Sequence, residues 1–404
     1  MLSQGSALVN ACFCAHRACN IGAKSGGGRE SPVIGSVKSD IGIHMPPSTR
    51  YKQNWAETQE RFEKWWHREP VDRPLMAIDA PRDVPLGDTA WPKEPKDPAQ
   101  QYLDLDYLIQ GTRCALEHSD FGSDALPEVT ANLGPGSLSL YLGSEPVFRP
   151  DTVWYRPCIE SLEKTPLPKY DPKNRWLRAH LDLFRKLRDV FGADAYLTIP
   201  DIIESTDILS AMRGPATFLY DIKDRPEQCR RWLERINSLY QVHYDAFYDL
   251  VKDDAGGSVF TAFHIWGPGR TVKVQCDFSA MISPEQFGEF FIPYVRKQIE
   301  GLDRVLYHLD GPNCICHVDQ LLKLERLHAI QWISGAGAAP NEDERWYPLY
   351  EKILKGGKGL HVSLPAGAVE GFVKRFGARG VYVLTSVKSA REARELMAQA
   401  KRAS

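Results

Sequence analysis

The sequence lacks long hydrophobic runs and carries almost no net charge. It has no stretch of about 18 or more apolar residues, which excludes a spanning helix because roughly 20 are needed to cross the hydrocarbon of a bilayer. The formal net charge of −2 supplies no field for holding a polyanion. We therefore expect neither a membrane nor a nucleic acid among the partners, and a small molecule as the ligand.

The sequence also lacks the two glycine-rich motifs that cradle phosphates at the start of a helix. Neither G-x-G-x-x-G after a first strand nor G-x-x-x-x-G-K-[ST] occurs, and Lys355-Gly-Gly-Lys-Gly359 is typical of a helix end and turn. This absence weighs against an open doubly wound sheet of the nucleotide-binding kind.

A disulfide framework is not expected. The nine cysteines are an odd number scattered over 404 residues, a usage typical of a reducing compartment, and we expect a cytoplasmic protein. Cys12, Cys14, His16 and Cys19 have a spacing reminiscent of metal ligands, but no small scaffold surrounds them.

The first fifty residues differ from the rest in having many glycines and serines, no acidic residue before Glu30 and no sustained periodicity. We expect residues 1–50 to be a disordered extension or one added by a start assigned too far upstream, with Met45 as the alternative start. An organellar transit peptide is a third interpretation, and we favour the upstream start.

Residues 51–404 are expected to form one α/β domain, because helices and short apolar strands alternate from Trp176 onwards. Such alternation predicts parallel strands joined by right-handed crossovers, and the length suits a (β/α)8 TIM barrel. The expected strands are 74–79, 195–199, 259–265, 304–309, 329–333, 360–364 and 382–384. The main expected helices are 225–253, 284–300, 342–354 and 390–402.

Two of these helices have a start signal in the sequence. Ser283 with Gln286, and Ser389 with Glu392, have the spacing of a capping box, and Pro284 suits the first helical position. Between residues 80 and 172, proline and short alternating runs predict a strand-rich excursion before the regular repeats.

Three histidines follow or end predicted strands, at the face where the binding groups of a barrel collect. His264, His308 and His361 could together bind a divalent cation, zinc or another, or shuttle protons. Each alone could equally be a hydrogen-bonded structural residue. His308 and Asp310 are two apart in an extended segment and therefore face the same side, although Asp310 could instead cap the following helix.

Further polar and aromatic residues stand at neighbouring strand ends. Asp201 could anchor a cationic or pyrrole-type N–H group or act as a base, or simply cap a helix. Arg270 could hold a carboxylate or phosphate, with a solvated surface arginine as the equal alternative. Trp266 and Trp332 are candidate substrate contacts at the same face.

These motifs give the chain a resemblance to the uroporphyrinogen decarboxylase superfamily, which includes cobalamin-dependent methyltransferases. The resemblance runs from about Pro74 to the end. It rests on five segments: Ala211-Met-Arg-Gly-Pro-Ala-Thr-Phe218, Asp224-Arg-Pro-Glu227, Cys276-Asp-Phe-Ser279 with Ile282-Ser-Pro-Glu-Gln-Phe287, Tyr307-His-Leu-Asp-Gly311 and Ile330-Gln-Trp332.

Two departures narrow what the resemblance implies. Uroporphyrinogen decarboxylases have an Arg-Gln-Ala-Gly-Arg segment after their first strand, where this chain has Asp79-Ala-Pro-Arg-Asp83, so only Arg82 could contact an acidic substrate group. The zinc-dependent methyltransferases read His-x-Cys where this chain has His308 and Asp310, and Thr385-Ser386 replaces their last cysteine. A metal here would have an N/O ligand set of His308 and Asp310, with His361 or His264.

The resemblance implies three alternative functions. The first is a methyltransferase of the corrinoid-dependent branch acting on a small substrate, with a corrinoid carried by a partner protein. His308, Asp310 and Asp201 would be catalytic, and His264, Trp266, Arg270, Trp332 and Arg82 would contact the substrate. The others are a decarboxylase of a tetrapyrrole-type or other carboxylated substrate, and a non-catalytic corrinoid- or tetrapyrrole-binding protein. A homodimer is the candidate assembly.

Overall fold

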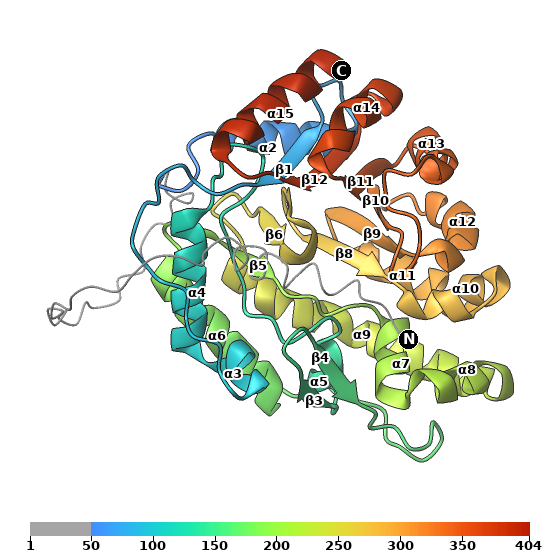
Figure 1. The fold of residues 1–404 in the computed structure, drawn as a ribbon. Helices are drawn as coiled ribbons and strands as arrows, with labels where there is room; N and C mark the ends of the chain where they lie inside the picture. The colour runs from blue at the N-terminus through green and yellow to red at the C-terminus, as the bar shows by residue number, and fades with distance from the viewer. Residues whose placement is uncertain (1–49) are drawn as a thin grey trace, which may run out of the picture.

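A computed structural model describes residues 50–404 of the chain (Figure 1). The predictions for the N-terminal extension, including its cysteines, lie outside the described residues. None of the helices in the described range is both long and apolar enough to cross a membrane.

The largest sheet has six strands, all parallel, in the order β1-β12-β11-β10-β9-β8. Most of its residues are buried, as expected where helices cover a parallel sheet, and Figure 1 shows α10 to α15 on its outer side. The pairing of β1 with β12 brings the first and last strands of the fold together. Its strands are β1 (Leu75–Asp79), β8 (Thr271–Gln275), β9 (Arg304–Asp310), β10 (Ala329–Ile333), β11 (Gly359–Ser363) and β12 (Val381–Ser386).

A second sheet has the order β2-β5-β6-β7, and a separate hairpin pairs β3 with β4. Its first three strands are parallel, whereas β6 and β7 are antiparallel. The strands are β2 (Glu128–Val129), β3 (Glu145–Phe148), β4 (Val153–Arg156), β5 (Tyr196–Ile199), β6 (Ser258–Phe260) and β7 (Ile265–Gly267).

The closed barrel expected from the sequence is not found: in the described part of the chain, no backbone ladder joins the two sheets. Side-chain oxygens accept hydrogen bonds from strand amides at both junctions, and at the first of them the amide of Asp124 also donates to the carbonyl oxygen of Met76 at 2.9 Å. Asp124 Oδ2 and Ser123 Oγ, just before β2, accept hydrogen bonds from the β1 amides of Met76 and Ile78 at 2.9 and 3.1 Å. At the other junction, between β6 and β8, Ser258 Oγ accepts a hydrogen bond from the amide of Thr271 at 3.0 Å. Buried backbone donors are thereby satisfied without strand pairing.

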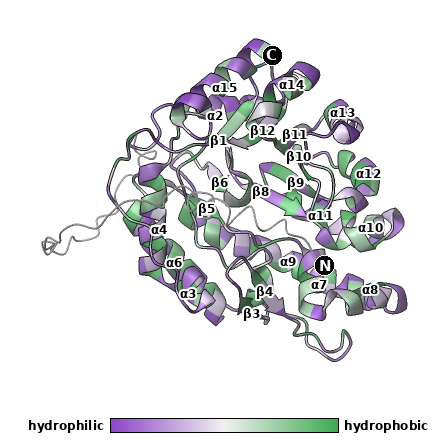
Figure 2. Cartoon of the chain, viewed as in Figure 1, coloured by the Kyte–Doolittle hydropathy of each residue, from purple (hydrophilic) through white to green (hydrophobic). Residues whose placement is uncertain are grey.

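Helices flank both sheets, and their apolar faces are turned inward (Figure 2). The α-helices are α2 (Trp55–His67), α3 (Pro98–Leu103), α4 (Leu105–His118), α5 (Leu138–Tyr141), α6 (Arg175–Phe191), α7 (Ser205–Arg213), α8 (Pro215–Asp224), α9 (Pro226–Val251), α10 (Pro284–Phe290), α11 (Ile292–Ile299), α12 (Val318–Leu322), α13 (Tyr347–Lys355), α14 (Ala366–Phe376) and α15 (Ala390–Ala403). Short 3-10 helices are η3 (Thr261–Phe263), η4 (Asp277–Met281), η5 (Pro312–His317) and η6 (Glu344–Trp346).

Several predicted elements are confirmed and others are wrong. Ser283 forms the full capping box with Gln286, and Ser389 caps α15 through the amide of Glu392. The predicted helix 284–300 divides at Phe291, because Pro293 cannot donate the amide bond that would continue it. The predicted strand 259–265 breaks at η3 and reverses. The region 80–172 contains helices α3, α4 and α5 rather than mainly strands.

Candidate metal centre

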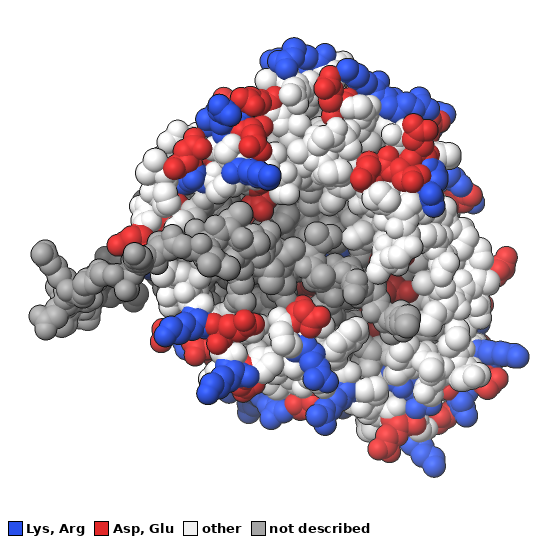
Figure 3. Space-filling model, viewed as in Figure 1, with Lys and Arg blue, Asp and Glu red and all other residues white. Residues whose placement is uncertain are grey.

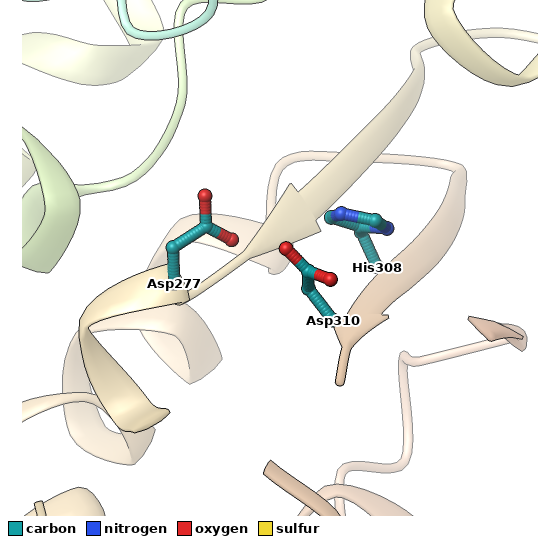
Figure 4. A group of neighbouring side chains, drawn as sticks. All are labelled: Asp277, His308 and Asp310. Atoms are coloured by element: carbon teal, nitrogen blue, oxygen red, sulfur yellow. The ribbon is translucent and has the colours of Figure 1, made fainter. Parts of the chain in front are cut away.

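Three potential metal ligands meet where β8 and β9 end. His308 and Asp310 come from β9, and Asp277 is the first residue of η4, directly after β8 (Figure 4). Gln275 is in register with His308, which sets the ends of the two strands side by side. One ligand atom from each of Asp277, His308 and Asp310 lies within 4.8 Å of the others. Two carboxylates and an imidazole form an N/O donor set suited to zinc or a harder divalent ion.

Gln331 on β10 fixes the orientation of the His308 ring. Its Oε1 accepts a hydrogen bond from His308 Nδ1, and its own Nε2 donates to the carbonyl oxygen of Trp332 at 2.9 Å. Because Nδ1 carries the proton in this arrangement, the lone pair of Nε2 is available to a ligand. Burial is the main cause that lowers the pKa of His308, although neighbouring Asp310 opposes it. The ring is therefore neutral at neutral pH, as metal binding requires.

The side chain of Asp207 holds the backbone at Asp277 in place. Asp207, in the first turn of α7, accepts hydrogen bonds from the amides of Asp277 and Phe278 at 2.8 and 3.0 Å. Burial, followed by the charges of Asp207 and Asp310, raises the pKa of Asp277 well above its usual range. Asp277 Oδ1 is buried and has no hydrogen-bond partner among residues 50–404. An orphaned carboxylate oxygen in such a place is what a cation would satisfy.

A single buried lysine faces the other carboxylates of the site. Lys273 on β8 is 1% exposed at its side chain, and its Nζ lies 2.8 Å from Asp201 Oδ2 and also contacts Gln275 Oε1. Glu204 accepts a hydrogen bond from the amide of Gln275, and burial raises its pKa well above the usual range. Acidic groups thus outnumber cations here, and the residues present fit a bound metal ion.

A cavity of about 240 Å³ opens beside this group. Asp201, Asp207, Gln275, Asp277 and His308 form its polar end. The remaining wall is largely apolar and includes aromatic side chains: Tyr102, Trp154, Tyr155, Phe263 and Phe278. A concave, mostly apolar space with a few converging polar groups is typical of a small-molecule site.

The other two predicted histidines lie close to the centre but outside the three-residue group. His361 on β11 is fully buried, with Nε2 3.1 Å from the carbonyl oxygen of Phe263, and burial lowers its pKa to about 3. His264 has a φ of 51°, in the region that non-glycine residues seldom adopt. Its Nδ1 lies 3.1 Å from Glu128 Oε2; burial lowers its pKa, but the carboxylate outweighs this and leaves the pKa raised.

None of the five predicted substrate contacts, His264 included, lines the cavity. Trp266 and Trp332 are buried, and the Trp332 ring packs against Trp346 at 5.0 Å. Arg270 precedes β8, at the end opposite Gln275, where its Nε lies 3.1 Å from Asp245 Oδ1. Arg82 donates from Nη2 to the carbonyl oxygen of Tyr51 at 3.0 Å. Of the residues predicted from the sequence, the structure brings His308, Asp310 and Asp201 together.

Sequence reasoning missed two residues that shape the site, Asp277 and Lys273. Asp277 stands within the Cys276-Asp-Phe-Ser279 motif but was given no role, and Lys273 belongs to a strand that was not predicted. The signal for both was the alternation of Thr271-Val-Lys-Val-Gln275, a short β pattern with a carboxylate two residues after its end.

Parallel strands with polar side chains at their ends define an α/β protein with a candidate metal centre. No family model matches the chain, and no curated protein matches it. Among solved structures, it is similar to a methyltransferase from Methanosarcina mazei, with 12% sequence identity and a TM-score of 0.53. The match covers 85% of this chain and 98% of the methyltransferase. At this low sequence identity, the structural similarity shows a shared fold alone.

We expect Gln331→Met to lower the affinity for zinc by about 10- to 100-fold, because the variant can no longer hold the His308 tautomer. Isothermal titration with zinc measures the effect. Gln298→Met, which changes a buried glutamine on α11, is the matched control and should bind zinc as the parent does. An unchanged affinity in Gln331→Met would contradict the assigned role.

Proposed function

We propose that this chain is a metal-dependent enzyme that transfers a methyl group to or from a small substrate. The observation that carries the proposal is the Asp277, His308 and Asp310 group beside a cavity of small-molecule size. The similarity in fold to a methyltransferase supports the same reaction class. A corrinoid carried by a partner protein is the proposed methyl carrier.

Some residues of the site would hold the metal ion, and others would position the substrate. Asp277, His308 and Asp310 would hold zinc or another divalent ion, which when bound lowers the pKa of a water or thiol and so supplies a nucleophile at neutral pH. Asp201, kept in place by Lys273, presents its unpartnered Oδ1 to the substrate as a hydrogen-bond acceptor or base. The apolar wall of the cavity would exclude water from the reacting groups.

Decarboxylation of a carboxylated substrate is the second candidate, and Asp201 is the observation that favours it. Its Oδ1 is buried and has no partner among the described residues, as would suit a carboxylate that receives pyrrole N–H groups. However, the described residues that line the cavity include neither lysine nor arginine, which disfavours a substrate with several carboxylates. On the face drawn in Figure 3, charged side chains of both signs alternate around the rim of the molecule.

Metal removal tests the proposal. Dialysis against a chelator should abolish transfer of the methyl group from methylcobalamin to a thiol, and zinc or another divalent ion should restore it. The spectrum of the corrinoid reports the reaction. Purified protein that transfers methyl groups equally well after chelation would contradict a metal-dependent mechanism.

We expect the zinc affinity to rise with pH and zinc binding to release protons. The pKa of Asp277 is raised, so its carboxylate is protonated in the metal-free protein over a range in which an ordinary aspartate is ionised. The metal must displace that proton, and affinity therefore increases until the pH passes the raised pKa. Titration calorimetry in buffers of different ionisation enthalpy counts the protons. No release, with a flat pH profile, would contradict the assignment of Asp277 as a ligand.

A further inference from the structure

The cavity beside the metal centre has a charge and a lining that point to one class of ligand. Five carboxyl groups, those of Asp201, Glu204, Asp207, Asp277 and Asp310, lie around a single lysine, Lys273. Acidic groups therefore outnumber basic ones at this end of the cavity.

Among residues 50–404, no lysine or arginine lines the cavity and could attract an anionic ligand. Lys273 is outside the lining and is paired with Asp201. His308 is 6% exposed and lines the cavity, and its hydrogen bond to Gln331 uses Nδ1. Within residues 50–404 no hydrogen bond uses Nε2, which leaves this nitrogen available to a ligand. An anionic substrate would be repelled from these walls, whereas a cation would be attracted.

Aromatic side chains make up part of the remaining cavity wall. The hydroxyls of Tyr102 and Tyr155 donate to the carbonyl oxygens of Arg149 and Leu133 at 2.7 and 2.8 Å, so these side chains contribute ring surface rather than hydrogen bonds. The Phe263 ring lies 5.1 Å from the His308 ring and joins the aromatic wall to the metal centre. Trp154, 48% exposed, also lines the cavity.

We infer that the cavity binds a small organic cation whose charge is spread over methyl groups, such as a methylated ammonium or sulfonium compound. The quadrupole of an aromatic ring attracts such a cation, and the ring face also packs well against its apolar methyl groups. Carboxylates alone would attract the charge but would not favour the methyl groups. The inference rests on the proposed function and specifies the substrate class of the same site. An onium centre is also a chemically suitable methyl donor. When a nucleophile such as a thiolate forms a bond to the methyl carbon, the C–N or C–S bond breaks and its electron pair stays on nitrogen or sulfur, which leaves as a neutral amine or sulfide.

Matched probes of one shape and different charge test the inference. Choline, its uncharged carbon isostere dimethylbutanol and the related carboxylate dimethylbutanoate are titrated into the full chain, with and without zinc, by calorimetry. We expect choline to bind at least about tenfold tighter than dimethylbutanol, the size of one or two cation–π contacts. Trp154→Leu should remove most of that preference, whereas Tyr220→Leu, at an exposed tyrosine on α8 outside the cavity, should leave it intact.

The outcome separates this inference from the proposed function. Three results would each overturn the cationic substrate class, whether or not zinc binds. They are equal binding of choline and dimethylbutanol, tighter binding of dimethylbutanoate, and no binding of choline. If zinc fails to bind but choline keeps its preference and loses it in Trp154→Leu, the metal-dependent reaction is wrong and the cation site stands.

Discussion

Replacing Lys273 by methionine is expected to lower the free energy of unfolding by about 3–5 kcal/mol, the usual effect of removing one partner of a buried ion pair. The side chain is 1% exposed, and its Nζ lies 2.8 Å from Asp201 Oδ2. Methionine has a similar length but leaves Asp201 and its acidic neighbours without a cation. Denaturation by urea, followed by circular dichroism, measures the change.

Two comparisons show whether the loss comes from the charge. Lys358→Met removes another buried lysine, whose Nζ donates to the carbonyl oxygen of Leu324 at 2.7 Å, and should cost less because no carboxylate is left unpaired. Adding Asp201→Asn to Lys273→Met should recover part of the stability. A loss below about 1 kcal/mol, typical of an exposed pair, would contradict a central role for Lys273.

The Lys273→Met variant should also become less stable as the pH rises. Burial raises the pKa of Glu204 above the ordinary value of 4.5, and Lys273 opposes that rise. A carboxyl group with a raised folded pKa contributes stability that is present below its unfolded pKa and is lost as the pH rises through its folded pKa. Without Lys273 the pKa of Glu204 rises further, so the loss extends to higher pH than in the parent. Unfolding curves across the acid to neutral range follow it.

His308→Ala is expected to lower the affinity for zinc by about 100-fold or more, beyond the effect of losing an outer-shell partner. His308 is the only nitrogen ligand in the described three-residue group, and two carboxylates alone hold zinc weakly. At a zinc concentration of about 100 times the dissociation constant, the parent should gain roughly 2.7 kcal/mol of stability. The variant should gain almost none at the same zinc concentration.

Each protein is compared with its own metal-free form, so any general loss of stability in the variant cancels. His67→Ala, at an exposed histidine that ends α2, should keep the full response to zinc. A zinc-dependent gain in His308→Ala equal to that of the parent would place the metal elsewhere.

Much of the large sheet could be predicted from the sequence because its strands are continuous apolar runs. The bounds of β9, β10 and β11 were predicted to within a residue or two, because a short, continuous apolar run is typical of a buried parallel strand. Strand β8 was missed because it buries Lys273 and Gln275, and polar residues lower the signal of a buried strand. Their burial is stabilised by the ion pair of Lys273 with Asp201, a residue far away in the sequence.

Barrel closure depends on details that hydrophobic patterning does not carry. At the junction of β1 with the segment before β2, the side chains of Ser123 and Asp124 receive the β1 amides, and a strand pattern gives no sign of this. The pairing of His308 with Asp310 was predicted from their spacing. Asp277 was not, because it reaches them only through the register of β8 with β9.

Anomalous diffraction at the zinc absorption edge, from crystals grown with zinc, tests the central claim most directly. We expect one peak between β8 and β9, about 2.0–2.2 Å from a carboxylate oxygen of Asp277, a carboxylate oxygen of Asp310 and Nε2 of His308. No peak there at saturating zinc, or a peak bound by other residues while these three keep their own contacts, would contradict it.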